Sequence, residues 1–235
     1  MAGIFHKERT VEIDGRKVPL RIRTSRRARN LLLSVDASDD AIDLVLPPGT
    51  PIYEGLRFVE SRARWLAGRI RSLPERVPLV DGEKIPVLGH QRLIRHRPDL
   101  RGGVWMEGGE IYVSGNTEHQ ERRVTDWLRR TAKTEISTRA HDKADQIGRR
   151  IDRVTIRDTR SLWGSCTEGG RLSFSWRLVL APVIVLDYVV AHEVAHLAEL
   201  NHSRRFWDIV AELTEDTKRA KAWLHAYGQT LHRYG

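Results

Sequence analysis

The chain has 235 residues, of which 40% are hydrophobic and 30% are charged, a balance typical of a globular protein with a sizeable core. Its single cysteine, Cys166, excludes both an internal disulfide and a cysteine-rich zinc site. The formal net charge of +9 is spread over both halves of the chain, so we expect at most weak, nonspecific binding of nucleic acid.

The first 117 residues predict a β-rich region that contains one helix. Short alternating runs in residues 10–46, separated by turn-forming residues, predict a small antiparallel meander. Apolar residues then recur at three- and four-residue spacing, which predicts an amphipathic helix over residues 52–73. A second β-rich stretch, residues 77–115, is punctuated by glycines. This composition ends near residue 117, so residues 1–117 are expected to form one domain.

Residues 118–235 are mainly helical in pattern and are expected to form the second domain. Helical spacing covers residues 118–147, and Gly148 is placed to cap that helix. Turn residues 167–170 join two strand-like runs into a hairpin, whose second strand alternates as far as residue 178. Pro182 suits the first turn of a helix that reaches about residue 200. The whole chain is therefore predicted to be α+β.

Two features of the sequence favour a cytoplasmic protein. The N-terminus becomes charged after a few residues and lacks the order of a signal peptide. The longest apolar region, residues 182–200, contains Asp187, His192 and Glu193, which hydrocarbon would penalise heavily. We therefore expect neither export nor a transmembrane segment, and no sequence feature indicates an oligomeric state.

An H-E-x-x-H pattern lies in that apolar region. His192 and His196 are four residues apart, so on a helix both rings leave the same face and can share one ion. Neutral imidazoles are ligands that zinc prefers, and Glu193 lies beside the open coordination position as a candidate general base. Burying these polar groups without partners would cost a few kcal/mol, so the pattern predicts a zinc site rather than three satisfied core residues.

The third ligand has two candidates, His202 and Glu199. A continuous helix would carry His202 about 15 Å further along its axis than His192, so the helix must end before it. Asn201 tolerates the left-handed conformation that ends helices, and Ser203 can cap the next helix. These residues predict a turn that brings His202 back, although Glu199 lies on the helix face of His196. We favour His202.

Two further assignments stay open on the sequence alone. A structural zinc is the main alternative to a catalytic one, but structural sites usually have four protein ligands and are rich in thiolate. Cys166 is, in descending order, a small buried hydrophobic residue, a redox-sensitive thiol near the site, or a reversible fourth zinc ligand.

The chain resembles the YgjP-like metallopeptidase family, which is related to the WLM and SprT-type zincins. The resemblance rests on "LWGSC" (residues 162–166), "LVLAP" (178–182), "LDYVVAHEVAHLAELNHSRRFW" (186–207) and "AWL" (222–224). It departs from the family at Leu162, where a basic residue is expected, with Arg160 two places earlier.

The resemblance implies a zincin-like catalytic half in which the zinc ligands are His192, His196 and His202 and the general base is Glu193. It also implies hydrolysis of a protein or peptide substrate, with an edge strand of the hairpin beside the active site. Trp163, Cys166 and Tyr188 would then lie near the site. The oxyanion-stabilising residue could be Tyr188, His225, Tyr227 or His232, which the sequence does not rank. The alternative function is a DNA-associated protein whose zinc only supports the fold.

Overall fold

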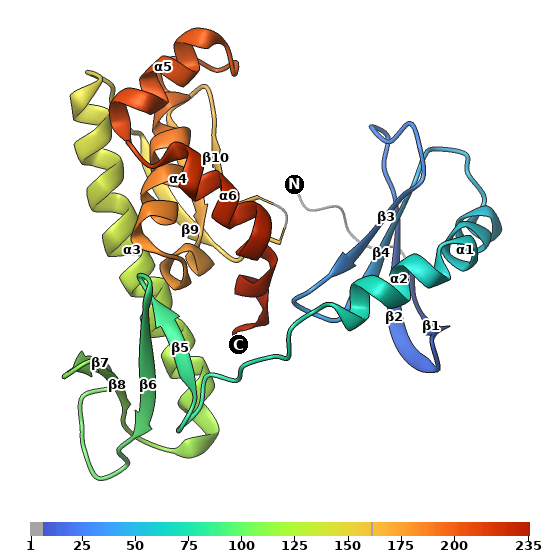
Figure 1. The fold of residues 1–235 in the computed structure, drawn as a ribbon, viewed down its shortest axis with the longest axis horizontal. Coiled ribbons are helices and arrows are strands. Elements are labelled where there is room, and N and C mark those ends of the chain that lie inside the picture. The colour runs from blue at the N-terminus through green and yellow to red at the C-terminus, as the bar shows by residue number, and fades with distance from the viewer. Residues whose placement is uncertain (1–6, 161) are drawn as a thin grey trace. The chain divides into compact units, whose positions relative to one another are not determined.

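The computed structural model describes residues 7–160 and 162–235 and has an α+β fold (Figure 1). The chain divides into two compact units, Met1–Glu75 and Arg76–Gly235, which are described separately below. No helix in the described part of the chain is both long and apolar enough to cross a bilayer.

The first unit contains a mixed four-stranded sheet. Its strands are β1 (Lys7–Ile13), β2 (Arg16–Thr24), β3 (Leu32–Asp36) and β4 (Ala41–Leu46), in the order β1-β2-β4-β3. Strands β2 and β4 run parallel, and the two outer pairs are antiparallel, so the prediction of an antiparallel meander is wrong. The reason is burial: β4 is the most apolar strand and takes a central position, whereas the more exposed β3 lies at an edge.

Two helices cover this sheet where one was predicted. Helices α1 (Ile52–Ser61) and α2 (Ala63–Arg71) are separated at Arg62, whose backbone leaves the helical conformation. Gly55 lets α1 approach β4 closely, because a Cβ at this position would lie within 2.8 Å of the Leu44 and Leu46 side chains. The predicted apolar face is otherwise confirmed, since Val59 and Leu66 are buried in the core of this unit.

The second unit begins with another four-stranded sheet. Its strands are β5 (Lys84–Val87), β6 (His90–His96), β7 (Val104–Glu107) and β8 (Glu110–Val113), in the order β5-β6-β8-β7. Buried residues of this sheet, such as Ile94 and Ile111, belong to the same core as the helices that follow. The boundary between the two units therefore lies between residues 75 and 76 rather than at residue 117. Near residue 117 the chain changes from strands to helices, but both belong to the same core.

A long helix spans the second unit, as predicted. After a short 3-10 turn, Thr117–His119, helix α3 (Gln120–Gln146) ends just before Gly148, whose φ of 61° is the left-handed conformation typical of the residue after a helix. Its buried face repeats at three- and four-residue spacing and packs on helix α4 (Val183–Ala195). The buried residues of that face are Val124, Leu128, Ala132, Ile136, Ala140 and Ala144.

The predicted hairpin forms two strands of a three-stranded sheet. Strands β10 (Gly164–Cys166) and β11 (Arg171–Ser175) pair antiparallel, and β9 (Arg153–Arg157) pairs parallel with β11 on its other side. Strand β11 ends at Ser175, three residues earlier than its alternation suggests, because residues 176–180 form a 3-10 turn whose side chains are all buried. The Ser175 hydroxyl accepts a hydrogen bond from the Arg177 amide at 3.4 Å and caps this turn.

Three short elements follow α4 and complete the unit. Helices α5 (Arg204–Leu213) and α6 (Thr217–Tyr227) are followed by a 3-10 helix, Gly228–Arg233. Both α5 and α6 pack against α4, the helix that carries the H-E-x-x-H pattern. This arrangement buries most residues of α4, and the site lies at the C-terminal end of that helix.

Candidate metal centre

The C-terminal end of α4 presents the H-E-x-x-H residues. Proline cannot donate a backbone hydrogen bond, and Pro182 directly precedes the first helical residue, Val183, as its N-cap. The helix ends at Ala195 with His196 as its C-cap, five residues earlier than predicted. The next amides bond back to the last turn, with Glu199 N donating to Ala195 O at 3.0 Å.

A turn over residues 196–203 brings the third histidine to the first two, as predicted. Ser203 caps α5, because its hydroxyl accepts a hydrogen bond from the Phe206 amide at 3.3 Å. The left-handed conformation predicted for Asn201 is wrong, since this residue is not among those with positive φ. Because α4 ends early, the chain reverses over more residues and needs no left-handed position there.

Three histidines converge into one group that could hold a metal ion. One ring nitrogen from each of His192, His196 and His202 lies within 4.8 Å of the other two. The Nε2 atoms of His192 and His202 are 3.1 Å apart. Two nitrogens bound to one tetrahedral zinc at 2.0–2.1 Å are separated by about 3.3 Å, so the spacing of this one pair is compatible with such an ion. Among the described residues, neither Cys166 nor Glu199 belongs to this group.

Glu199 contributes its backbone rather than its carboxylate. Its carbonyl oxygen accepts a hydrogen bond from Nδ1 of His196 at 3.1 Å. This bond fixes the tautomer that leaves Nε2 of His196 free as a ligand, which is the usual arrangement around metal-binding histidines. The rival assignment of Glu199 as third ligand therefore has no support in the geometry.

Burial favours the neutral form of two of the three histidines, His192 and His196. Burial and, to a smaller extent, the neighbouring charges of His196, His202 and Lys221 together lower the pKa of His192 to about 4. Burial also lowers the pKa of His196, against the opposing effect of its bond to Glu199. Neutral imidazoles have lone pairs for a metal at physiological pH, so no proton must be displaced from these two rings.

Glu193 lies buried beneath strand β10. Only 6% of this residue is exposed, and burial raises the pKa of its carboxyl to about 7. A Cβ at Gly164 of β10 would lie 2.5 Å from Cγ and 2.7 Å from Oε1 of Glu193, so the glycine makes room for the side chain. A carboxyl with a pKa near neutrality can both take and return a proton, as a general base must.

The residues expected near the site lie at different positions around it, and some contact other residues instead. The Tyr188 ring lies 6.0 Å from the His192 ring, and burial followed by the charge of Glu193 raises the pKa of its phenol. On β10, the pKa of the Cys166 thiol is raised to about 11 by burial and by Glu193, which fits a neutral packing residue. The Trp163 ring instead stacks on His232 at 5.2 Å, and His225 and Tyr227 are exposed on α6.

Three residues that the sequence did not single out surround the histidines. The Phe206 ring is fully buried and lies 4.9, 4.5 and 4.7 Å from the rings of His192, His196 and His202. Trp207 lies 5.9 Å from His192 and carries the Lys221 ammonium 3.5 Å from its ring centroid. Phe206 could have been anticipated, because it is the first apolar residue of a helix capped by Ser203 and therefore belongs to the face that is buried.

Comparison with known proteins identifies the family of this chain. One solved structure, the metallopeptidase zymogen of Pyrococcus abyssi abylysin, is 22% identical, with a TM-score of 0.36, and the match covers 42% of this chain and 97% of that one. A search of curated proteins finds no match. The family model for the YgjP-like metallopeptidase domain matches residues 29–227, which include both β10 and the three histidines. The chain therefore belongs to the YgjP-like metallopeptidase family.

Proposed function

We propose that the protein is a zinc peptidase in which Glu193 is the general base. The observation that carries this proposal is the convergence of three imidazoles next to a buried carboxyl group in a chain of a metallopeptidase family. The proposed zinc ligands are His192, His196 and His202.

The donor set favours a catalytic zinc over a structural one. Structural zinc sites are usually closed by four protein ligands, whereas the described residues offer three here. Zinc in such an open site lowers the pKa of water toward about 7 and polarises a carbonyl group. The three histidines suit this ion by their number and by the imidazole nitrogens they offer.

The chain's own residues then supply the proton transfers. Glu193 lies in a buried position with a pKa near 7, so it can accept the proton of the attacking water and pass it to the leaving amine. Tyr188 stays protonated because its pKa is raised, so its phenol can donate a hydrogen bond to the carbonyl oxygen as negative charge develops there. Its place beside His192 makes it the first choice among the four candidates for this role.

Strand β10 offers the place for an extended substrate. It pairs with β11 on one side and is an edge strand of its sheet in the described part of the chain. An added peptide strand would bond to the β10 backbone, and the contact of Gly164 with Glu193 would bring its scissile carbonyl close to the base. We therefore propose unfolded or extended protein segments as the substrate class.

His202→Ala should lower zinc affinity far more than Glu199→Ala. The first change removes a ligand, and we expect a loss beyond the roughly 100-fold upper range for residues that only orient ligands. The second keeps the backbone carbonyl that bonds His196, so its effect should be small. Zinc titration of both purified variants measures this order. A larger loss for Glu199→Ala would overturn the assignment of the third ligand.

Cleavage of unfolded proteins with and without a chelator tests the proposed activity. The account predicts cleavage that stops when zinc is removed and returns when zinc is added, because the ion supplies the acidity that Glu193 exploits. Mass spectrometry of the products identifies the cleaved bonds. Cleavage that continues without any metal would contradict the proposal. Zinc binding without cleavage, together with DNA binding that survives high salt, would favour the DNA-associated alternative instead.

A further inference from the structure

A groove separate from the metal centre runs between α3 and β9. It has a volume of about 680 Å³, and none of the residues that line it is a proposed zinc ligand or the proposed base. Three of its cationic side chains, Arg129, Arg130 and Lys133, are exposed along α3. A fourth, Arg157, is exposed at the end of β9. Both α3 and β9 therefore contribute positive charge to the groove.

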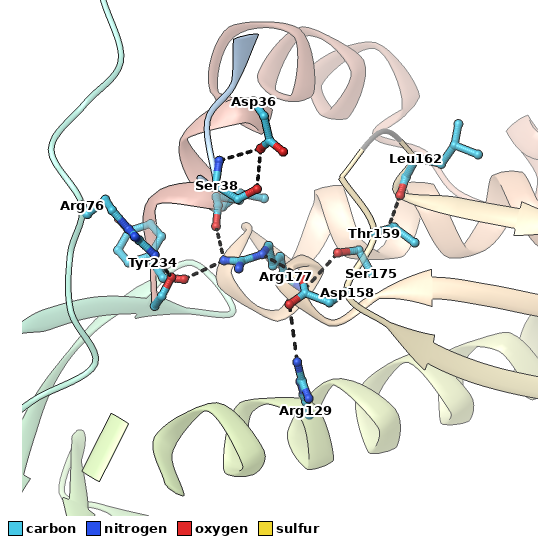
Figure 2. Close-up of polar contacts among 12 residues, drawn as sticks. Asp36, Ser38, Arg76, Arg129, Asp158, Thr159, Leu162, Ser175, Arg177 and Tyr234 are labelled. Carbon is cyan, nitrogen blue, oxygen red and sulfur yellow. Dashed lines mark hydrogen bonds and ion pairs between the residues drawn. The ribbon is translucent and has the colours of Figure 1, made fainter. Parts of the chain in front are cut away.

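Among the described residues, the one carboxylate that lines this groove, Asp158, already has partners. Asp158 accepts from Arg129 at 3.4 Å and from the buried Arg177 at 3.2 Å, as Figure 2 shows. Arg177 in turn donates to the Tyr234 carbonyl at 2.6 Å, which holds this network in place. Within residues 7–160 and 162–235, no ion pair involves Arg130, Lys133 or Arg157. These three charges remain for a ligand.

Strand β9 supplies a second recognition element along the same groove. It pairs with β11 on one side and is the edge strand opposite β10 in the described sheet. Its half-buried Val154 and Ile156 line the groove between the charged ends. An edge strand presents a row of backbone N–H and C=O groups that an added strand can bond.

We propose that this groove binds an extended acidic peptide segment, which adds to β9 as a strand and places carboxylates on Arg130, Lys133 and Arg157. The backbone edge matches a peptide, whose own N–H and C=O groups alternate with the same period. Nucleic acid fits less well, because no aromatic side chain lines the groove to stack on bases. Binding here does not depend on the proposed catalysis, since the residues involved are different.

The test measures binding of a fluorescent peptide of alternating glutamate and valine to the full chain, with chelator present so that no cleavage interferes. Arg130→Glu combined with Lys133→Glu should weaken binding by at least about tenfold, because attraction becomes repulsion. The matched control is Arg149→Glu with Arg150→Glu, an equal charge change at two exposed residues outside the groove, which should leave affinity within about twofold. A copy of the peptide with methylated backbone nitrogens should also bind at least about tenfold more weakly, because it cannot donate to β9.

The proposal is overturned if the groove variant binds like the parent, if the control weakens binding equally, or if the methylated peptide binds equally well. It is also overturned if a single-stranded oligonucleotide of equal charge binds more tightly and loses affinity in the groove variant, which would make the groove a nucleic-acid site. Circular dichroism checks the fold of each variant, and the neutral pair Arg130→Gln with Lys133→Gln serves if the charge reversal disturbs α3.

Discussion

Gly164→Ala should lower hydrolysis by about a hundredfold while zinc stays bound. The added Cβ would lie 2.5 Å from Cγ and 2.7 Å from Oε1 of Glu193, a separation that forces the carboxylate to move. Glu193 is 94% buried, so its side chain has little room to yield without leaving its position. A shift of about 1 Å in a catalytic group can reduce a rate by about a hundredfold.

Gly169→Ala is the matched control for this substitution. Gly169 lies in the turn of the same hairpin, and the nearest atom to an added Cβ is Thr167 Oγ1 at 4.0 Å. Neither glycine has a positive φ, so alanine strains neither backbone, and the two variants differ in what their methyl groups meet. Steady-state kinetics with zinc content and melting temperature should show a defect in the Gly164 variant alone. Parent-like activity of Gly164→Ala would show that β10 does not fix the position of Glu193.

Local periodicity explains which parts of the fold were predicted. Helix α3 and its buried face follow from apolar spacing within the helix itself, and the turn before β11 follows from adjacent turn residues. The C-terminal end of α4 was predicted five residues too late, because apolar and helix-forming residues continue past Ala195 although the chain already turns there. The break at Arg62 was missed for the same reason, since no proline or glycine marks it.

Strand pairing and the unit boundary depend on contacts that are distant in sequence. Strand β4 inserts between β2 and β3 and pairs parallel with β2, a choice set by how much apolar surface each strand can bury. Ile94 and Val113 belong to the core around α3 and α4. The β-rich sequence that contains them nevertheless resembles that of the first unit. Neither the parallel pairing of β4 nor the position of the unit boundary can be predicted from the local sequence.

The candidate site likewise combines local features, which the sequence predicts, with tertiary contacts, which it does not. The histidines are close in sequence, so helix geometry, the Ser203 cap and the family resemblance together predicted that His202 returns to His192 and His196. The contact of Gly164 with Glu193 joins a strand to a helix, and Lys221 reaches Trp207 from another helix. Such contacts arise only from tertiary packing, so the sequence did not predict them.

Glu193→Gln should keep the fold and the zinc but lower hydrolysis by at least about a hundredfold. The amide preserves the shape of the side chain in its buried position and loses the basicity needed to accept a proton from water. Removal of a general base typically reduces a rate by about a hundredfold to ten-thousandfold. Glu199→Gln is the matched control, because the same chemical change affects a carboxylate outside the histidine group and leaves its backbone bond to His196.

The most direct test of this account is the rate at which zinc-loaded Glu193→Gln cleaves an unfolded protein that the parent cleaves. Zinc content and melting temperature are measured on the same samples, since a collapsed helix would mimic a catalytic defect. The account predicts parent-like zinc content, a folded protein and a rate at least about a hundredfold below those of the parent and of Glu199→Gln. Cleavage by the folded, zinc-loaded variant at the parent rate would contradict the assignment of Glu193 as the base and the mechanism proposed here.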